Sequence, residues 1–409
     1  MRLLYLTPTA SMGGAERVLL DLLGLVRRAK PSWPVGLIVG NDGQLADDAR
    51  RLGVRTIVLP FPRELARLGD ARLAAADTEP SAWASFIGRA VGGSFPILAY
   101  VRRLRREMAA FDPDIVHSNG LKMHLLGAVA RPVRSSLIWH FHDYLGSRPV
   151  TSRLVKHLKG RCRAIAAVSE SVAADVRREL GASVDISTVW NAVDLTRFTP
   201  DGPRLDLDAL AGLRAANPGV VRVGLVATFA RWKGHLTFLE VMQPLAAAHN
   251  VRAYIVGGPM YQTDGSQFTV RELRAAAARL GMESSVGFTG FVKNPAAALR
   301  SLDVVVHAST SPEPFGLVIA EAMACGRPVV VSNSGGVAEL VRPEHDALTC
   351  PSGDARELRR QLERLIRNAD LRRRLGSAAR AAAVERFNPD RFIQQMMQLY
   401  TRFQRAAAA

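Results

Sequence analysis

The strongest constraint on the fold is an alternation of short apolar runs with longer amphipathic stretches, which recurs along most of the 409 residues. Apolar runs of roughly four to eight residues are typical of buried strands, and amphipathic stretches of about ten or more are typical of helices. Strands that alternate with helices form parallel sheets with helices on both faces. The sequence therefore predicts an α/β protein built on parallel sheets.

The alternation occurs in two series separated by a break. Candidate strands of the first series lie at residues 2–8, 35–40, 55–60, 114–119, 135–142, 163–169 and 186–193. The second series lies at residues 221–229, 251–258, 285–290, 302–309, 327–333 and 347–350. The break at residues 191–219 is rich in proline, glycine and aspartate, which are typical of a linker. Because one core rarely serves a chain this long, we predict two tandem Rossmann-like, doubly wound domains.

The same pattern sets the predicted domain boundaries. Residues 1–195 form the N-terminal domain and residues 196–386 the C-terminal domain, which ends in helical stretches. Residues 61–110 interrupt the alternation, and we predict a helical insertion there. Residues 387–409 are predicted to form a C-terminal helix that packs back toward the N-terminal domain.

The chain carries 54 Lys and Arg against 37 Asp and Glu, which gives a formal net charge of +17. This excess suits an anionic partner, or it is spread over solvated helix faces. Aromatic residues make up only 6% and do not alternate with basic ones, so we expect no nucleic-acid partner. One predicted helix carries Arg102, Arg103, Arg105 and Arg106 after an apolar stretch. Such a helix indicates an anionic membrane surface or, alternatively, a solvated face.

Cysteine usage and the chain start indicate the compartment. Cys162, Cys325 and Cys350 are far apart and form no C-x-x-C pair, which is typical of a reducing compartment without a zinc or disulfide framework. The first ten residues contain too short an apolar stretch for a signal peptide. No run of about 20 apolar residues occurs. We expect a cytoplasmic protein, with peripheral association at the inner face of the cell membrane as an option.

Two glycine-containing loops each follow a predicted strand and precede a predicted helix, where doubly wound sheets bind ligands. Gly13 and Gly14 would let backbone N–H groups approach an anion, although a tight turn without a ligand has the same pattern. Arg231 and Lys233 precede Gly234, and two cations beside a helix start suit a diphosphate; the alternative is an exposed basic turn. Neither loop has the G-x-G-x-x-G spacing of an NAD-dependent oxidoreductase.

Residues 311–331, SPEPFGLVIAEAMACGRPVVV, place two glutamates in an apolar run. We predict a helix whose N-terminal N–H groups come from Phe315, Gly316 and Leu317. Glu313 would precede this helix, where a carboxylate also stabilises the helix dipole. Glu321, about two turns into the helix, must pair with a polar group, and a ligand hydroxyl is one candidate.

These residues resemble the E-x7-E motif of retaining glycosyltransferases, most closely glycosyltransferase family 4, which has the GT-B fold. The resemblance extends over nearly the whole chain. GGAERVLLDLL resembles the family's glycine loop, WNAVDLTRF its interdomain segment and RWKGH its donor-phosphate segment. Two positions depart from the family pattern, since Ala192 replaces a glycine and Thr228 stands near the place of an arginine. Arg231 is expected to take over that arginine's phosphate contact.

The resemblance implies an active site in the interdomain cleft, a nucleotide-diphosphate sugar as donor, retention of anomeric configuration, and no metal ion or other cofactor. Asp112 and Asp114 have the D-x-D spacing of metal-dependent enzymes, but they precede a predicted strand and are interpreted as a turn. The acceptor is expected to be a glycan or a lipid-linked saccharide of cell-envelope biosynthesis. A small natural product as acceptor is one alternative. A non-enzymatic basic protein that binds membranes or nucleic acid is another.

Residue roles follow from the same resemblance. Glu313, Lys233, Arg231 and His142 are the expected catalytic residues, with Glu313 on the sugar hydroxyls and the two cations on the leaving diphosphate. His140 is the alternative to His142, because the two are expected to face opposite sides of a strand. The expected donor-binding residues are Gly13, Gly14, Thr228, Phe291, Val292, Phe315, Gly316, Leu317, Val318 and Glu321, the last on the ribose. The expected acceptor-binding residues are Arg17, His117, Asn119 and Lys122, although the last three are also compatible with ordinary polar residues at a strand end.

Overall fold

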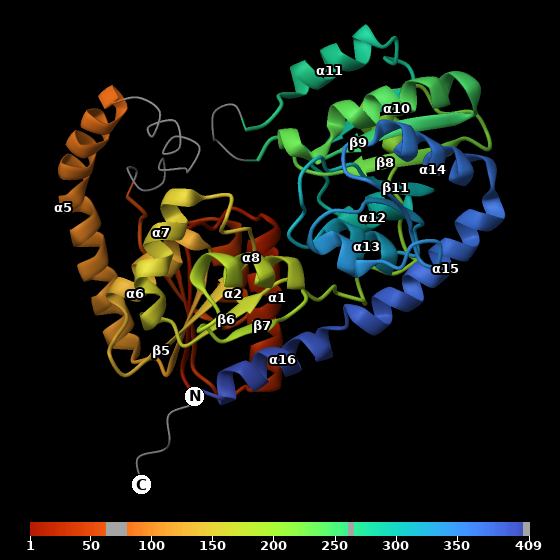
Figure 1. The fold of residues 1–409 in the computed structure, drawn as a ribbon. Coiled ribbons are helices and arrows are strands. Elements are labelled where there is room, and N and C mark those ends of the chain that lie inside the picture. The colour runs from red at the N-terminus through yellow and green to blue at the C-terminus, as the bar shows by residue number, and fades with distance from the viewer. Residues whose placement is uncertain (63–79, 261–265, 404–409) are drawn as a thin grey trace. The chain divides into compact units, whose positions relative to one another are not determined.

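The computed structural model describes residues 1–62, 80–260 and 266–403 (Figure 1). Its internal contacts divide the chain into two compact units. The first unit comprises Met1–Asn191 together with Asp390–Ala409, and the second comprises Ala192–Pro389. The boundaries predicted after residues 195 and 386 fall a few residues from these divisions.

The first unit is built on a parallel sheet of seven strands in the order β3-β2-β1-β4-β5-β6-β7. The strands are β1 (Leu3–Thr7), β2 (Val35–Val39), β3 (Arg55–Val58), β4 (Ile115–Asn119), β5 (Ser136–Phe141), β6 (Ala164–Ala167) and β7 (Ile186–Thr188). The strand order reverses between β1 and β4, which pair in register from Leu3 with Ile115. The carboxyl ends of these two strands therefore flank the switch point at which doubly wound sheets bind ligands.

The helices of the first unit connect and cover these strands. They are α1 (Gly14–Ala29), α2 (Gln44–Arg51), α5 (Pro80–Phe111), α6 (Leu121–Ala130), α7 (Pro149–Leu158), α8 (Glu170–Leu180) and, from the end of the chain, α16 (Pro389–Thr401). The predicted insertion at residues 61–110 is helical over α5, and its residues 63–79 lie outside the described part.

Helix α5 turns its apolar face into the first unit. Tyr100, Leu104 and Met108 are buried, and α5 packs against α6. Arg102, Arg103, Arg105 and Arg106 of this helix are exposed, and Arg105 donates to the Val129 carbonyl at 2.8 Å. Tyr100, Leu104 and Met108 are thus used in the core, whereas Leu98 is 47% exposed, and the association of this helix with an anionic membrane surface stays a prediction. Among residues 1–62, 80–260 and 266–403, no helix has both the length and the apolar character needed to span a bilayer.

The second unit is built on a parallel sheet of six strands in the order β10-β9-β8-β11-β12-β13. The strands are β8 (Val221–Val226), β9 (Val251–Val256), β10 (Val286–Gly290), β11 (Val304–His307), β12 (Val329–Ser332) and β13 (Leu348–Cys350). The order reverses between β8 and β11, which again makes a switch point. Each strand predicted from the sequence is present, and the prediction of two doubly wound parallel sheets is confirmed.

The helices of the second unit are α9 (Leu207–Ala211), α10 (His235–Ala248), α11 (Val270–Arg279), α12 (Pro295–Arg300), α13 (Leu317–Ala324), α14 (Ala355–Arg367) and α15 (Ala369–Arg386), with short 3-10 turns at Arg231–Lys233 and Gly336–Leu340. They leave strands such as β11 and β12 entirely buried, which explains their valine runs.

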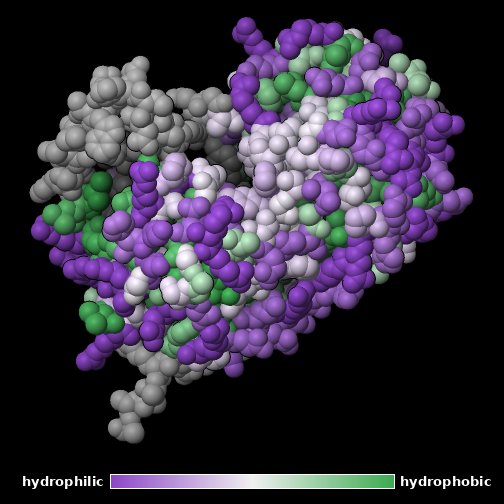
Figure 2. All heavy atoms as spheres, viewed as in Figure 1, coloured by the Kyte–Doolittle hydropathy of each residue, from purple (hydrophilic) through white to green (hydrophobic). Residues whose placement is uncertain are grey.

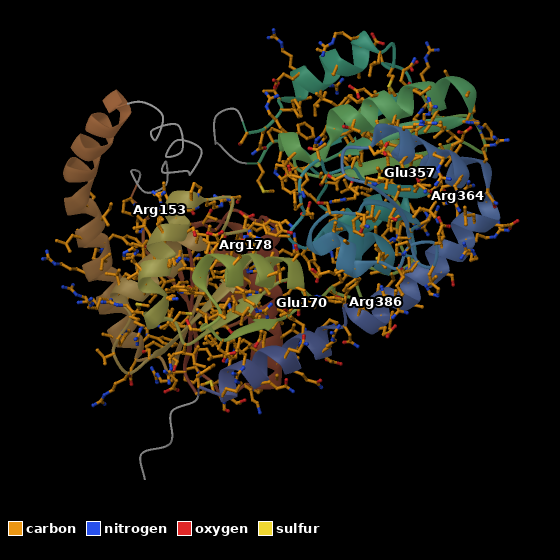
Figure 3. The ribbon with its side chains drawn as sticks, viewed as in Figure 1. Arg153, Glu170, Arg178, Glu357, Arg364 and Arg386 are labelled. Carbon is orange, nitrogen blue, oxygen red and sulfur yellow. The ribbon has the colours of Figure 1, made fainter. Side chains whose placement is uncertain are left out.

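Helices α14 and α15 present a largely hydrophilic surface (Figure 2). Arg364 of α14 donates to Glu344 at 2.7 and 2.8 Å, and Arg386 at the end of α15 pairs with the buried Asp346 at 2.9 Å; both arginines are labelled in Figure 3. Many of the arginines behind the net charge of +17 therefore serve as solvated or paired groups on helices.

Candidate active site

A cluster of polar side chains lies at the carboxyl ends of β8 and β11. Lys233 follows β8, His307 ends β11, and Ser309 and Glu313 lie in the loop after β11. Lys233 Nζ donates to Glu313 Oε2 at 2.5 Å. His307 Nε2 lies 3.2 Å and Ser309 Oγ 3.3 Å from the same oxygen. One carboxylate oxygen thus gathers three polar groups at the switch point of the second sheet.

Glu313 is ionised at neutral pH. Burial raises the pKa of its carboxyl, but the charge of Lys233 and the hydrogen bond from His307 outweigh burial and hold the pKa at about 2. The residue is only 8% exposed. An ionised, pre-oriented carboxylate of this kind can accept hydrogen bonds from the hydroxyls of a sugar.

A glycine brings the lysine loop close to β11. Gly234 has a φ of 76°, and a Cβ at this position would lie 1.8 Å from the Ala308 carbonyl oxygen. Thr310 N–H donates to the Trp232 carbonyl at 2.8 Å, which ties the two loops together. Because only glycine accepts both the conformation and the close approach, Gly234 positions Lys233 beside the loop of Glu313.

Helix α13 begins at Leu317, with Gly316 as its N-cap at a φ of 89°. The first backbone bond of the helix runs from Ile319 N–H to the Gly316 carbonyl at 2.9 Å, so the N–H groups of Leu317 and Val318 belong to the open first turn. Phe315 is buried just before the helix. Glu321 is buried on α13, one turn into the helix and not two as predicted, because the helix starts at Leu317.

Arg231 contacts the start of α11. Its Nη2 donates to Glu272 at 2.9 Å, and its guanidinium lies 4.4 Å from the centre of the Phe268 ring. Glu272 also caps α11 together with Thr269. A phosphate would have to compete with Glu272 for this guanidinium, and the proposed diphosphate contact of Arg231 stays a prediction.

The remaining predicted donor residues of the second unit lie at the ends of β8 and β10. Thr228 follows β8 and is half-buried. Phe291 and Val292 follow β10; the Phe291 ring is 57% exposed and lies so close to Gly258 that a Cβ there would be 2.9 Å from it. An exposed aromatic ring at a strand end is a surface on which a nucleobase could stack.

In the first unit, Gly13 ends the loop after β1 and Gly14 is the first residue of α1. Gly13 caps α1 with an extended φ of −92°, so neither glycine is required for a left-handed turn. A Cβ on Gly14 would meet no atom within 4 Å. Gly14 therefore leaves open space at the helix start, as close approach of an anion would require. Arg17 lies one turn further along α1 and is half-buried.

At the carboxyl ends of β4 and β5, His142 Nε2 lies 2.5 Å from Asn119 Oδ1. The rings of His140 and His142 are 4.1 Å apart. The prediction that these two histidines face opposite sides is wrong, because residues two apart along an extended strand share a face. Burial lowers the pKa of His142 to about 3, so its ring is neutral. Lys122 Nζ lies 5.9 Å from the centre of the Phe61 ring.

His117 is fully buried in the first unit. Both ring nitrogens are bonded, Nδ1 with the Tyr400 hydroxyl at 2.9 Å and Nε2 with His140 at 3.2 Å. The prediction of His117 as an acceptor contact is therefore not carried further, because the side chain offers no surface to a ligand.

Sequence reasoning missed His307 and Ser309, both of which contact Glu313. The motif VVVHAS held a signal, since a polar residue that ends a buried valine strand lies at the carboxyl edge of the sheet. Asp114 accepts a hydrogen bond from the Arg2 backbone N–H at 2.7 Å, and Asp112 has a φ of 50°. Within the described part of the chain, no group of three or more His, Cys, Asp and Glu side chains is arranged to hold a metal ion.

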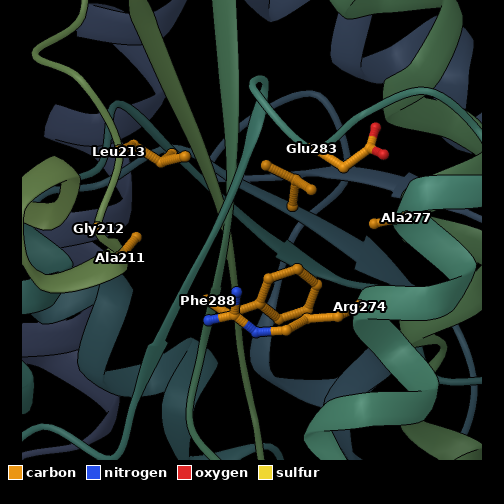
Figure 4. Close-up of a pocket in the computed structure, with 8 residues that line it drawn as sticks. Ala211, Gly212, Leu213, Arg274, Ala277, Glu283 and Phe288 are labelled. Carbon is orange, nitrogen blue, oxygen red and sulfur yellow. The ribbon is translucent and has the colours of Figure 1, made fainter.

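A cavity of about 200 Å³ lies at the edge strand β10, away from these clusters (Figure 4). It is lined by Ala211, Gly212, Leu213, Arg274, Ala277, Glu283, Val286 and Phe288. Val286 is the first residue of β10, so the cavity lies toward the amino end of the strand. Ligands of doubly wound sheets bind at the opposite, carboxyl end.

Two doubly wound sheets, each with polar side chains at its switch point, define the class of twin Rossmann-like proteins with GT-B architecture. Anabaena HepE in complex with UDP-glucose has this fold, with a TM-score of 0.78 at 23% identity over 98% of this chain and 100% of HepE. The sequence model described as Glycosyltransferase Family 4 matches residues 12–197, and that described as Glycosyl transferases group 1 matches residues 215–382. The chain therefore belongs to the glycosyltransferases that these two models describe, glycosyltransferase family 4 (group 1).

Relatives of known name match parts of the chain. N-acetyl-alpha-D-glucosaminyl L-malate synthase of Bacillus anthracis is 26% identical over 63% of this chain and 64% of its own length. D-inositol 3-phosphate glycosyltransferase of Streptomyces bingchenggensis is 30% identical over 68% of this chain and 64% of its own length. The matched region thus spans less than two thirds of these relatives.

Proposed function

We propose that the protein is a retaining glycosyltransferase that moves a sugar from a nucleotide-diphosphate donor to an acceptor hydroxyl. The observation that carries the proposal is the bond of 2.5 Å between Lys233 and Glu313 at the switch point of the second sheet. It joins a cation suited to a diphosphate with a carboxylate suited to sugar hydroxyls. Family membership and the UDP-glucose complex of Anabaena HepE support a nucleotide sugar as donor.

The leaving group is the chemical problem that the second unit would solve. A nucleoside diphosphate departs only if its developing negative charge is neutralised. Lys233 supplies a full positive charge, and the N–H groups of Leu317 and Val318 supply the positive end of the α13 dipole. Arg231 would add a second cation if it exchanged Glu272 for a phosphate oxygen. We propose that these groups replace a metal ion in the reaction.

At the sugar, Glu313 would accept hydrogen bonds from the donor hydroxyls and Glu321 from the ribose hydroxyls. The bond from the anomeric carbon to the diphosphate oxygen breaks, and the acceptor oxygen bonds to the same face of that carbon. The acceptor proton passes to the departing phosphate oxygen, so no side chain needs to act as base. His142, whose neutral Nδ1 remains an acceptor when Nε2–H donates to Asn119, would face the sugar.

For the acceptor, we propose a hydroxyl of a glycan or a lipid-linked saccharide, bound by Arg17, Asn119 and Lys122 of the first unit. A small hydroxyl-bearing anion is a second candidate, because two relatives are named for L-malate and D-inositol 3-phosphate. The exposed Arg102, Arg103 and Arg106 of α5 would hold an anionic membrane surface mainly by charge, since Tyr100, Leu104 and Met108 of the same helix are buried in the core.

A thermal-shift panel of UDP, GDP and ADP tests the donor class, because a ligand that binds only the folded state raises the melting temperature. We expect one diphosphate to stabilise the wild-type protein and to lose this effect in Lys233→Met. No shift with any of the three diphosphates would contradict the proposal. A second assay then separates the acceptor classes. The sugar ester of the stabilising diphosphate is the donor, and L-malate, inositol phosphate and a lipid-linked saccharide are offered one at a time as acceptors. The acceptor that causes release of the diphosphate identifies the class.

A further inference from the structure

A chain of hydrogen bonds crosses the core of the first unit from β1 to β5. The hydroxyls of Tyr5 and Tyr400 lie 3.1 Å apart, and the Tyr400 hydroxyl lies 2.9 Å from Nδ1 of His117. Nε2 of His117 lies 3.2 Å from Nδ1 of His140. These four side chains are at most 1% exposed, so they exchange hydrogen bonds with one another and not with solvent.

The chain of hydrogen bonds ends at His140, which lies beside His142. The His140 ring contacts the His142 ring at a centroid distance of 4.1 Å and an interplanar angle of 42°. The other side of His142 is held by Asn119, whose Oδ1 lies 2.5 Å from Nε2. The position of the His142 ring thus depends on the residue that terminates the buried chain.

The hydrogens of this chain can run in two directions. Burial lowers the pKa of His117 to about 3 and that of His140 well below its usual range, so each neutral ring carries one N–H. In the first direction Tyr5 donates to Tyr400, Tyr400 to His117 Nδ1, and His117 Nε2–H to His140 Nδ1. His140 then carries its hydrogen on Nε2. In the second direction every bond is reversed and His140 carries its hydrogen on Nδ1.

The first direction satisfies more groups. His140 Nε2 has no hydrogen-bond partner among the described residues in either case. In the second direction the hydroxyl hydrogen of Tyr5 also loses its acceptor, because the Tyr400 hydroxyl then donates to Tyr5. A buried donor without an acceptor is costly, so the structure favours the direction with a single unpaired group.

We propose that Tyr400 is a positioning residue for His142: its hydroxyl donates to His117, fixes His140 as the Nε2–H tautomer and so fixes the ring against which His142 packs. The proposal rests on the proposed function only for the role of His142 toward the donor. Without the Tyr400 hydroxyl, His117 can carry its hydrogen on Nδ1. His140 then carries its hydrogen on Nδ1 as well, and its buried Nε2 becomes an unprotonated acceptor.

Nitrogen NMR of the full chain labelled with ¹⁵N-histidine tests the tautomers directly. We expect only Nε2–H for His117 and His140 in the wild-type protein, and a population of the Nδ1–H tautomer of His140 in Tyr400→Phe, because both directions then leave the same number of unpaired groups. An Nδ1–H tautomer of His140 in the wild-type protein would overturn the proposal. The NMR spectrum does not depend on turnover, so it tests the tautomers even if the protein transfers no sugar. Absence of glycosyl transfer would contradict the proposed function and not the tautomer assignment.

Turnover supplies the second test, with Tyr5→Phe as the matched control. Tyr5→Phe removes a hydroxyl of equal burial but leaves Tyr400 free to donate to His117. We expect kcat to fall about tenfold in Tyr400→Phe with the donor KM unchanged, and to stay within about twofold of wild type in Tyr5→Phe. Equal kcat values in the two variants would refute the proposal. If Tyr400→Phe does not fold, the wild-type spectrum decides.

Discussion

Nζ of Lys233 lies 2.5 Å from Oε2 of Glu313, although the two residues are 80 positions apart in the chain. An ammonium group has three donors, and this bond uses one of them. The remaining two are oriented by the fixed position of the first. The lysine proposed to meet the diphosphate is therefore held in place before any donor binds, which lowers the cost of ordering it in the reaction.

Replacing Lys233 with Met should remove the charge that stabilises the leaving diphosphate while keeping most of the apolar stem. We expect turnover to fall by about 10²- to 10³-fold, the usual effect of removing one group that stabilises developing charge. Lys293→Met is the control, because Lys293 is an exposed lysine of the same unit. Release of nucleoside diphosphate measures both variants, and an equal loss in the two would contradict the role of Lys233.

The pKa of Glu313 makes stability depend on pH. In the folded protein the pKa of the Glu313 carboxyl is about 2, which is lower than in the unfolded chain, so the unfolded state binds the proton more readily. The stabilisation is complete above about pH 4.5 and is lost as the pH falls toward 2; it amounts to roughly 3 kcal/mol.

Glu313→Gln lacks this contribution. We expect its deficit in the free energy of unfolding to be largest near neutral pH and to shrink progressively below about pH 4.5. Denaturant unfolding of both proteins over this range measures the difference. A deficit that is the same at every pH would show that Glu313 is not held ionised by its partners.

Two glycines should respond in opposite ways to alanine. Gly234→Ala forces a Cβ against the Ala308 carbonyl in a left-handed conformation, and we expect a loss of more than about 2 kcal/mol of stability. Gly14→Ala meets no atom and adds helix propensity, so stability should hold or rise slightly.

Gly14→Ala should nevertheless raise the donor KM, since the new methyl group occupies the space left for the ligand. Melting temperature and donor KM, measured together, separate the two effects. An unchanged KM in a stable Gly14→Ala protein would show that the loop is a turn without a ligand.

Removal of divalent ions should leave turnover unchanged. We propose that Lys233 and the start of α13 supply the positive charge that a metal would otherwise bring to the diphosphate. Dialysis against EDTA, followed by assay with and without added Mg²⁺ or Mn²⁺, tests this. A loss of activity that either ion restores would contradict the proposed metal-independent reaction.

Membrane association should depend on charge and not on insertion. Replacing Arg102, Arg103 and Arg106 with Gln should reduce co-sedimentation with anionic vesicles at low salt, and binding of the wild-type protein should weaken as salt rises. The control replaces Arg356, Arg359 and Arg367, exposed arginines of α14, with Gln. No binding of the wild-type protein, or an equal loss in both triple variants, would contradict the membrane proposal.

Local patterns predicted the elements well. The valine runs at residues 304–307 and 329–332 form buried strands because helices cover both faces of the sheet, and a continuous apolar run is what such a strand requires. The glycine before residue 317 marked the start of α13, since its φ of 89° suits only glycine.

Pairings between distant residues were not predictable from one sequence. Glu272 lies 41 positions from Arg231, and Tyr400 lies 283 positions from His117, so no local spacing relates them. The sequence placed Glu313 and Lys233 each before a predicted helix, but the direct contact between them depends on the pairing of β8 with β11 in the sheet. The prediction that His140 and His142 face opposite sides misapplied strand geometry, because side chains two residues apart in a pleated strand point to the same side.

The first unit draws its residues from both ends of the chain, and this governs the order in which it can be completed during synthesis. When the ribosome has made β1 through β7, His117 is still without the hydroxyl of Tyr400, and Phe392 and Met396, which are buried in the folded protein, have not yet been made. Nearly 200 residues of the second unit, Ala192–Pro389, are translated before α16 emerges. A separately expressed first unit would therefore need the α16 segment joined back to Asn191 to reach the same folded state.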